Sequence, residues 1–367
     1  MLKHIFKVYK KLFSASLNTF GFFSKDFLSI LGIPFYLLFT HFTLWLDNIF
    51  FPAYKKVEIK NPVFIIGHPR SGTTFFHRLM IKSDEYLNFK SWQLFFPSLT
   101  ASKFIKPIID RIIANGNATI FPPTTGHYAR LDLPEEEEQL FMHLCDSQFT
   151  SIIFSLGFYK GDFDEILFND EQEHQKKSVN FFKNCLKRHI YQTGKKQVVA
   201  RCNFSGMRLQ HLAAEFPDAK FIYFYRNPLE SIPSHLSLNR SVFDYKWGLD
   251  KIGNEAMQRY YNRRYRYNVI YYKYLENILQ QPEIKDKVMQ IHYSQLLENF
   301  EATMQKTIEF MNIDISEALK SEIKVQAEKQ KNYQRKHKVY ELEMFGLSEE
   351  KIKKDLAFMF EKIGYKI

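Results

Sequence analysis

The stretch that decides the fold is Asn61-Pro-Val-Phe-Ile-Ile-Gly-His-Pro-Arg-Ser-Gly-Thr-Thr-Phe-Phe-His-Arg-Leu79. Its apolar run, residues 63–66, is typical of a strand buried on both faces of a parallel sheet. Glycines and a proline then break the run between Gly67 and Gly72, which indicates a turn. Apolar residues at helical spacing follow from Thr73 onward. Together these features predict an anion-binding loop, because the free amides of a first helical turn and the helix dipole favour negative charge.

The spacing within this loop, Gly67 followed by Gly72-Thr73-Thr74, is that of a nucleotide P-loop with one change. A Walker loop carries Lys where this chain has Thr73, and the cation here is Arg70, inside the loop. The arginine fork binds phosphate or sulfate oxygens in a bidentate manner. The loop therefore predicts binding of a phosphate-bearing group without Walker chemistry.

Composition and charge limit which fold and which binding partners the chain can have. The chain has 367 residues, 45% of them hydrophobic, which supports one large α/β domain with extensions and argues against disorder. Its net charge of +11 suits nucleic acid, an anionic membrane face or a polyanionic small ligand. Cys145, Cys185 and Cys202 are odd in number and far apart, so the sequence signals neither a disulfide framework nor a metal site.

The N-terminus predicts a hydrophobic helical extension over residues 1–51, followed by a catalytic domain over residues 52–367. Residues 27–46 contain no Asp, Glu, Lys or Arg, and a run of this length can cross a bilayer. Gly32-Ile-Pro34 and basic residues on both flanks weaken a spanning assignment. A helix lying in the membrane face and a helix packed on the soluble domain are the alternatives. We expect membrane contact through residues 27–46, with the catalytic domain on the cytoplasmic side.

Three further apolar runs, at residues 198–200, 221–225 and 288–293, are predicted strands with helices between them. This alternation indicates an α/β fold with a P-loop-like central parallel sheet flanked by helices. The Tyr- and Arg-rich segment 254–280 is predicted to be a packing helix rather than a nucleic-acid surface, because several of its tyrosines share one helical face. Lys324–Lys338 is expected to be a loop or a frayed helix.

Pro69-Arg-Ser-Gly-Thr-Thr74 resembles the 5′-phosphosulfate loop of the sulfotransferases, which use 3′-phosphoadenosine 5′-phosphosulfate (PAPS). In that family an Arg directly after a later strand and a Ser eight residues further on hold the 3′-phosphate, and Arg226 and Ser234 match this spacing. Phe216–Ala219 and Lys338–Leu347 are similar to other segments of bacterial-type members. Where the family commonly has a His, this chain has Ser205, so no catalytic role is carried over to that position.

The resemblance implies direct sulfuryl transfer to an acceptor oxygen or nitrogen, with Arg70 stabilising charge on the moving group and no metal required. The cofactor-binding residues that it implies are Arg70, Ser71, Gly72, Thr73, Thr74, Arg226 and Ser234. A base must take the acceptor proton, and His127 competes for this role with the acidic run Glu135–Glu138. We expect Glu136 or Glu137 to act with His127, since a Pro-Glu-Glu segment lies near the active site of the resembling enzymes. The alternative is that these glutamates are solvated charges at a helix start.

Three function classes follow. The first is a PAPS-dependent sulfotransferase acting on a small-molecule, lipid or glycan acceptor, with no nucleic-acid partner. The second is a P-loop-like kinase or NTPase, which Thr73 disfavours. The third is a non-catalytic, basic binder of nucleic acid or of a membrane surface. We predict the first, and the apolar N-terminus favours a lipid or a membrane-bound glycan as the acceptor.

Overall fold

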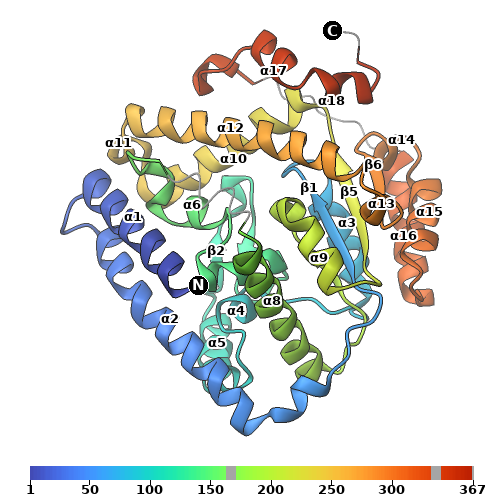
Figure 1. Ribbon diagram of the computed structural model, residues 1–367, viewed down its shortest axis with the longest axis horizontal. Coiled ribbons are helices and arrows are strands. Elements are labelled where there is room, and N and C mark those ends of the chain that lie inside the picture. The colour runs from blue at the N-terminus through green and yellow to red at the C-terminus, as the bar shows by residue number, and fades with distance from the viewer. Residues whose placement is uncertain (163–170, 332–339, 366–367) are drawn as a thin grey trace. The chain divides into compact units, whose positions relative to one another are not determined.

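The computed structural model describes residues 1–162, 171–331 and 340–365 (Figure 1). These residues form two compact units, and each unit collects segments that are far apart in the chain. The first unit comprises Met1–Glu58, Phe89–Gly194 and Ser237–Arg263. The second comprises Ile59–Asn88, Lys195–Leu236 and Arg264–Ile367.

The second unit is built on a parallel sheet with the strand order β4-β1-β5-β6. Its strands are β1 (Val63–Gly67), β4 (Val199–Arg201), β5 (Lys220–Tyr225) and β6 (Val288–His292). β1 lies between β4 and β5, and all of its residues are buried, as its continuous apolar run predicts. The four predicted strands and the α/β fold with a central parallel sheet are therefore confirmed.

One face of this sheet is covered by α3 (Thr73–Met80), α14 (Gln295–Glu298), α15 (Phe300–Met311) and α16 (Glu317–Lys331). Side chains alternate across a strand, so Ile65 and Ile222 reach this core together. The segment from Lys324, expected to be a loop or a frayed helix, is helical as far as Lys331, because Ala327 packs into the core and holds the helix there. The remainder of that prediction, residues 332–338, lies outside the described residues.

The opposite side of β1 presents Phe64, which packs on the rings of Phe216 and Phe221. Phe216 follows α9 (Leu209–Glu215). Helices α10 (Pro228–Trp247) and α12 (Asn254–Ile278) each contribute residues to both units. The part of α12 in the second unit buries Tyr265, Tyr267, Tyr271 and Tyr272, and the hydroxyl of Tyr271 donates to the carbonyl oxygen of Asn203 at 2.6 Å. The prediction of a packing helix is therefore confirmed.

Short helices complete the second unit: α13 (Pro282–Lys285), α17 (Glu349–Asp355) and α18 (Ala357–Lys362). The hydroxyl of Ser348 accepts a hydrogen bond from the amide of Lys351 at 3.2 Å and so caps the start of α17.

The first unit is mostly helical. Its elements are α1 (Leu2–Phe20), α2 (Lys25–Phe50), α4 (Ser91–Phe95), α5 (Leu99–Ala114), α6 (Thr150–Ile153), α8 (Gln172–Thr193), α11 (Leu249–Ile252) and the antiparallel pair β2 (Thr119–Phe121) and β3 (Ala129–Arg130). Val8 and Leu12 of α1 share an apolar core with Ile30 and Leu37 of α2. The predicted hydrophobic helical extension is thus present as a helical pair.

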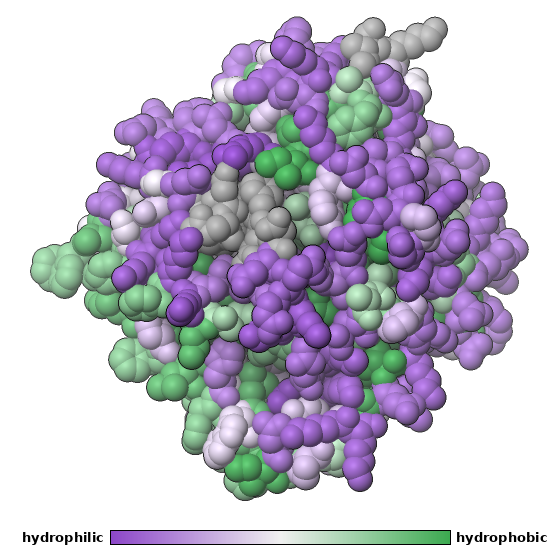
Figure 2. Space-filling view, in the orientation of Figure 1, coloured by the Kyte–Doolittle hydropathy of each residue, from purple (hydrophilic) through white to green (hydrophobic). Residues whose placement is uncertain are grey.

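Helix α2 has two contrasting faces. One is buried in the first unit and includes the fully buried Asp47, whose carboxylate lies 2.8 Å from Nε of Arg188. The other exposes large apolar side chains: Leu28, Leu31, Phe35, Leu38, Phe39, Phe42, Trp45, Ile49 and Phe50. Figure 2 shows hydrophobic residues gathered on the side where α1 and α2 lie in Figure 1. Within the described ranges, α2 is the one helix with the length and composition to cross a membrane.

Candidate active site

The loop between β1 and α3 has an unusual backbone. Gly67, Arg70 and Gly72 have φ values of 150°, 74° and 103°. A Cβ atom on Gly67 would lie 2.3 Å from the carbonyl oxygen of Phe224 on β5, so only glycine fits there. Arg70 adopts a left-handed conformation without being glycine, at a cost on the order of 1–3 kcal/mol. Strain of this kind is concentrated at ligand-binding sites, and the rest of the loop must hold it in place.

Ser71 supplies part of that restraint. Its hydroxyl donates to the carbonyl oxygen of His68 at 2.6 Å, and its amide donates to the same oxygen at 3.2 Å. The resulting tight turn leads directly into Thr73, the first residue of α3. The N–H groups of that first turn have no partner within the helix, so they are available to an anion.

The structure brings the two predicted anion-binding groups together. Nε of Arg70 donates to Oγ of Ser234 at 3.1 Å, and Nη1 of Arg226 donates to the carbonyl oxygen of Arg70 at 2.9 Å. Arg226 directly follows β5, and Ser234 lies on the second turn of α10. Because β1 and β5 are parallel neighbours, their carboxyl ends deliver these residues to the same edge of the sheet.

Arg226 is held on three sides. Its Nε lies 2.7 Å from Oε2 of Glu230, and its guanidinium carbon lies 4.5 Å from the ring centre of Tyr293. The third contact is the carbonyl oxygen of Arg70. Arg70 itself is exposed to solvent, so a ligand can reach its guanidinium group. Two guanidinium groups with one nearby carboxylate make this edge of the sheet suited to an anion with more than one negative charge.

Beneath the loop lies a group that sequence reasoning missed. The ring of His68 stacks on Tyr272 at 5.1 Å between centroids and lies 5.4 Å from the ring of His235. Burial lowers the pKa of His68 to about 4. Burial is the main cause that lowers the pKa of His235 well below its usual range, and the neighbouring His68 and Arg264 add to this effect. Both imidazoles are therefore neutral at pH 7 and do not add to the positive charge. In the sequence, only their positions could have pointed to them, because His68 lies within the loop and His235 directly follows Ser234.

The predicted base residues belong to the first unit. Nε2 of His127 lies 3.3 Å from Oε1 of Glu135, so its acidic partner is Glu135 rather than Glu136 or Glu137. The amide of Phe89 donates to Oε1 of Glu137 at 3.4 Å. All four glutamates of the run are at most 8% exposed, so the alternative of solvated charges at a helix start is wrong. The roles of His127, Glu136 and Glu137 stay predictions.

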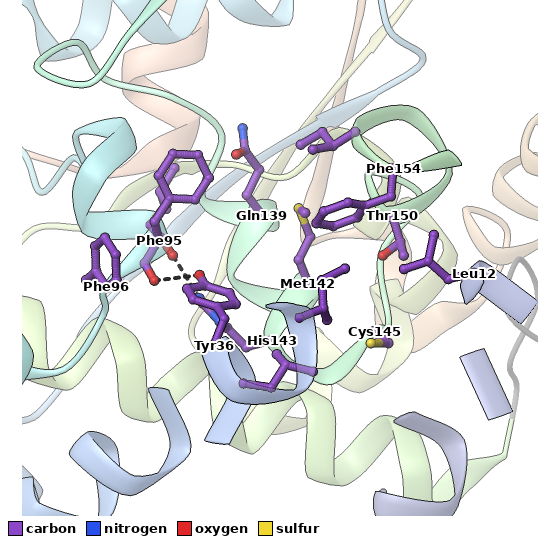
Figure 3. Close-up of a pocket in the computed structure, with 14 residues that line it drawn as sticks. Leu12, Tyr36, Phe95, Phe96, Gln139, Met142, His143, Cys145, Thr150 and Phe154 are labelled. Carbon is purple, nitrogen blue, oxygen red and sulfur yellow. Dashed lines mark hydrogen bonds between the residues drawn. The ribbon is translucent and has the colours of Figure 1, made fainter. Parts of the chain in front are cut away.

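The first unit also contains an apolar cavity of about 310 Å³ (Figure 3). Its walls are Leu12 of α1, Ile33, Tyr36 and Leu37 of α2, Leu94, Phe95 and Phe96, Gln139, Met142, His143 and Cys145, and Thr150, Ile153 and Phe154. The hydroxyl of Tyr36 donates to the carbonyl oxygen of Phe95 at 2.7 Å.

The cavity has polar atoms that a ligand could contact, and its wall reaches the surface of α2. Within the described part of the chain, Nδ1 of His143 and Oγ1 of Thr150 are buried without a hydrogen-bond partner. The ring of Phe96 lies 6.1 Å from that of Tyr36 and 6.4 Å from that of the exposed Phe39. The wall of the cavity therefore also touches the exposed apolar face of α2.

Comparisons with known proteins identify similar sequences and folds. Over 206 residues the chain is 24% identical to omega-hydroxy-beta-dihydromenaquinone-9 sulfotransferase Stf3 of Mycobacterium bovis and of Mycobacterium tuberculosis. This match covers 54% of the chain and 51% of each relative, so the chain spans about half the length of the curated relatives it matches.

Two solved structures share the fold. Sulfotransferase STF9 from Mycobacterium avium has a TM-score of 0.71 at 14% identity, covering 98% of this chain and 97% of that one. Sulfotransferase STF1 from Mycobacterium tuberculosis has a TM-score of 0.67 at 17% identity, covering 95% and 92%. At these identities the likeness concerns the fold.

The match to the sulfotransferase family model is broader and runs over residues 62–317. It begins just before β1 and contains the loop at Arg70, the strand β5, and both Arg226 and Ser234. The family predicted from the loop motif is therefore confirmed, and this chain belongs to the sulfotransferase family.

Proposed function

We propose that this protein transfers a sulfuryl group from PAPS to a hydroxyl group of a lipid-type acceptor. The observation that carries the proposal is the convergence of Arg70, Ser234 and Arg226 at the carboxyl edge of β1 and β5. PAPS carries a 5′-phosphosulfate and a 3′-phosphate, and it therefore needs two sites of anion binding. The loop with its first-turn amides suits the first, and Arg226 with Ser234 suits the second.

When bound, PAPS supplies a sulfuryl group attached to a phosphate leaving group. Arg70 and the amides of Thr73 and Thr74 stabilise the charge that develops on the sulfuryl and phosphate oxygens. The acceptor oxygen forms a bond to sulfur as the bond from sulfur to the bridging phosphate oxygen breaks. The products are a sulfate ester and 3′-phosphoadenosine 5′-phosphate (PAP).

The acceptor proton must leave as the new bond forms. We assign its removal to the group formed by His127, Glu136 and Glu137. The contact of His127 with Glu135 supports this assignment, because a neighbouring carboxylate fixes the orientation and the tautomer of an imidazole ring.

Two observations support a lipid acceptor. The relatives named above are sulfotransferases of a menaquinone derivative, which is a lipid. The apolar cavity of about 310 Å³ has roughly twice the volume of a 150 Å³ cavity that binds benzene. By proportion, it holds a hydrocarbon segment of about twelve carbon atoms.

The exposed apolar face of α2 supports membrane contact. Helices with one apolar face and basic flanks lie in the membrane surface. We propose that α2 lies there, with its buried face on the first unit, and that the catalytic domain faces the cytoplasm. Binding of the full chain to anionic vesicles should fall when the exposed Phe39 and Phe42 are both changed to Glu. Unchanged vesicle binding would remove this part of the proposal.

The deciding experiment incubates the full chain in mild detergent with labelled PAPS and separate pools of long-chain lipid alcohols, glycans and phenols. Sulfation of the lipid pool, lost in Arg70→Ala together with PAP binding, supports the proposal. The matched control is Arg78→Ala, an exposed arginine on α3, which should keep PAP affinity within about twofold. Transfer that survives Arg70→Ala would refute the assigned site, and sulfation of glycans or phenols alone would refute the lipid acceptor.

A further inference from the structure

Three side chains with metal-binding chemistry meet in the first unit, and the proposed sulfuryl transfer uses none of them. His4 lies on the first turn of α1, Asp146 follows the 3₁₀ helix Glu137–Leu144, and His174 lies on the first turn of α8. One donor atom from each lies within 4.8 Å of the other two. Asp146 and His174 are 2% and 4% exposed. We propose that this cluster binds a divalent metal ion of the zinc type.

The distances are close to those of a tetrahedral site. Zinc with bonds of about 2.0–2.1 Å separates its ligand atoms by roughly 3.3 Å. Nε2 of His174 lies 3.2 Å from Oδ2 of Asp146, which matches that separation. The rings of His4 and His174 have centroids 4.4 Å apart. The donor of His4 must move inward by at most about 1.5 Å to complete the site, which a side chain on the first turn of a helix can do.

A divalent ion brings positive charge into a largely buried place. The carboxylate of Asp146, which is 2% exposed, balances part of that charge.

The surroundings provide the outer contacts that metal ligands need. The hydroxyl of Ser178, one turn along α8, donates to Oδ2 of Asp146 at 2.5 Å. The ring Nε2 of His4 lies 3.1 Å from the carbonyl oxygen of Cys145. Hydrogen bonds to a ligating carboxylate, and from a ligating imidazole to a backbone carbonyl, orient the ligands of most metal sites. Two imidazoles and one carboxylate leave a fourth position open to water, as in sites of the His₂-carboxylate class.

The donor set also decides which ions should bind. Imidazole nitrogen suits zinc, cobalt and other transition ions, whereas Mg²⁺ and Ca²⁺ prefer oxygen ligands. Binding would join the first turn of α1 to α8. That turn has no side-chain cap and no acidic residue, so α1 gains an anchor that its own sequence does not supply.

The competing explanation needs no metal. Asp146 lies beside the start of α8, where the helix dipole favours a negative charge, and it pairs with His174. In that case the cluster only holds α8 in place. The two explanations differ in one observable, since a purely structural cluster has no stoichiometric affinity for Zn²⁺.

The test uses the untagged full chain, stripped with a chelator and titrated separately with Zn²⁺, Co²⁺ and Mg²⁺. We expect one Zn²⁺ or Co²⁺ per chain, a Co²⁺ absorption spectrum of nitrogen and oxygen ligation, and a Zn²⁺-dependent rise in Tm of about 5 °C at a hundredfold excess over Kd. His174→Ala should weaken binding by at least 100-fold, and Ser178→Ala by about tenfold or more. The control His211→Ala removes a partly exposed histidine on α9 and should leave binding unchanged.

Because His174 is buried, its replacement can also destabilise the unit, so His4→Ala serves as the second variant. His4 is only partly buried, and its loss should abolish the Zn²⁺-dependent rise in Tm while circular dichroism stays that of the unaltered protein. The proposal is overturned if the stripped chain takes up no Zn²⁺ or Co²⁺, if His4→Ala and His174→Ala bind as tightly as His211→Ala, or if Mg²⁺ binds in preference to Zn²⁺.

Discussion

Replacing Asp47 by Asn tests a buried polar network of the first unit. The Asp47 carboxylate accepts hydrogen bonds from Nε of Arg188 at 2.8 Å and from Oγ of Ser98 at 2.9 Å. It also accepts from the amides of Leu99 and Thr100, at 3.1 and 2.8 Å. It therefore joins the end of α2 to the start of α5 and to the C-terminal half of α8. Its side chain is fully buried, and that of Arg188 is 6% exposed.

The expected loss of stability follows from the interactions that remain once Asn replaces Asp47. Asn has nearly the same shape as Asp, so the packing persists, but the Arg188 guanidinium loses its counter-charge in a buried environment. Breaking a buried ion pair by removing one partner costs about 3–5 kcal/mol. An exposed pair is worth about 0–1 kcal/mol. We therefore expect Asp47→Asn to lower the free energy of unfolding by about 4 kcal/mol.

The assay is urea denaturation in mild detergent, followed by circular dichroism. The matched control is Asp110→Asn on α5, whose partner Lys106 forms an exposed pair at 2.6 Å, and it should cost less than about 1 kcal/mol. Adding Arg188→Met to Asp47→Asn should recover about 2 kcal/mol, because no buried charge is then left unpaired. If Asp47→Asn costs no more than the control, the reasoning about this network fails.

Three further outcomes are expected. Gly67→Ala should weaken PAP binding at least tenfold in calorimetry or lower Tm, because its Cβ would lie 2.3 Å from the carbonyl oxygen of Phe224. The control Gly32→Ala, whose Cβ would meet no atom within 4 Å and whose backbone φ is not positive, should leave PAP binding unchanged and should not lower Tm, and equal behaviour of the two variants would contradict this. Arg226→Lys should weaken PAP binding by about 10–100-fold, because a Lys ammonium group cannot bind Glu230, the Arg70 carbonyl and a phosphate at the same time. If Arg226→Lys bound PAP as tightly as Arg78→Lys does, Arg226 would not belong to the site. Burial lowers the pKa of His143 from 6.5 to about 4. Between these two pH values the imidazole is protonated in the unfolded chain but not in the folded one. The free energy of unfolding therefore falls as the pH falls through this range, by about 3 kcal/mol in total. His143→Gln should remove that part of the pH dependence in denaturation curves, and an unchanged pH profile would show that His143 does not cause it.

Much of the candidate site could be predicted from the sequence, because its parts are local. The strand at Val63, the turn at Gly67 and the start of α3 follow from short-range chemistry. Predicting that Arg70 lies beside Arg226 and Ser234 requires one rule about tertiary structure. Neighbouring parallel strands end at the same edge, so residues that follow β1 and β5 meet there even though Arg70 and Ser234 are 164 positions apart.

What only the tertiary structure decided is which polar side chains face inward. The acidic run at Glu135 has the composition of a solvated helix start, yet it is buried. Residue spacing gives no sign that Asp47 pairs with Arg188, 141 positions away, or that His4 meets Asp146 and His174. Local propensity and periodicity depend on neighbours in the chain, whereas the burial of a charge depends on the partner that distant packing brings to it. The sequence by itself determined the sheet, the loop and the family; the folded chain determined the environments of these charges.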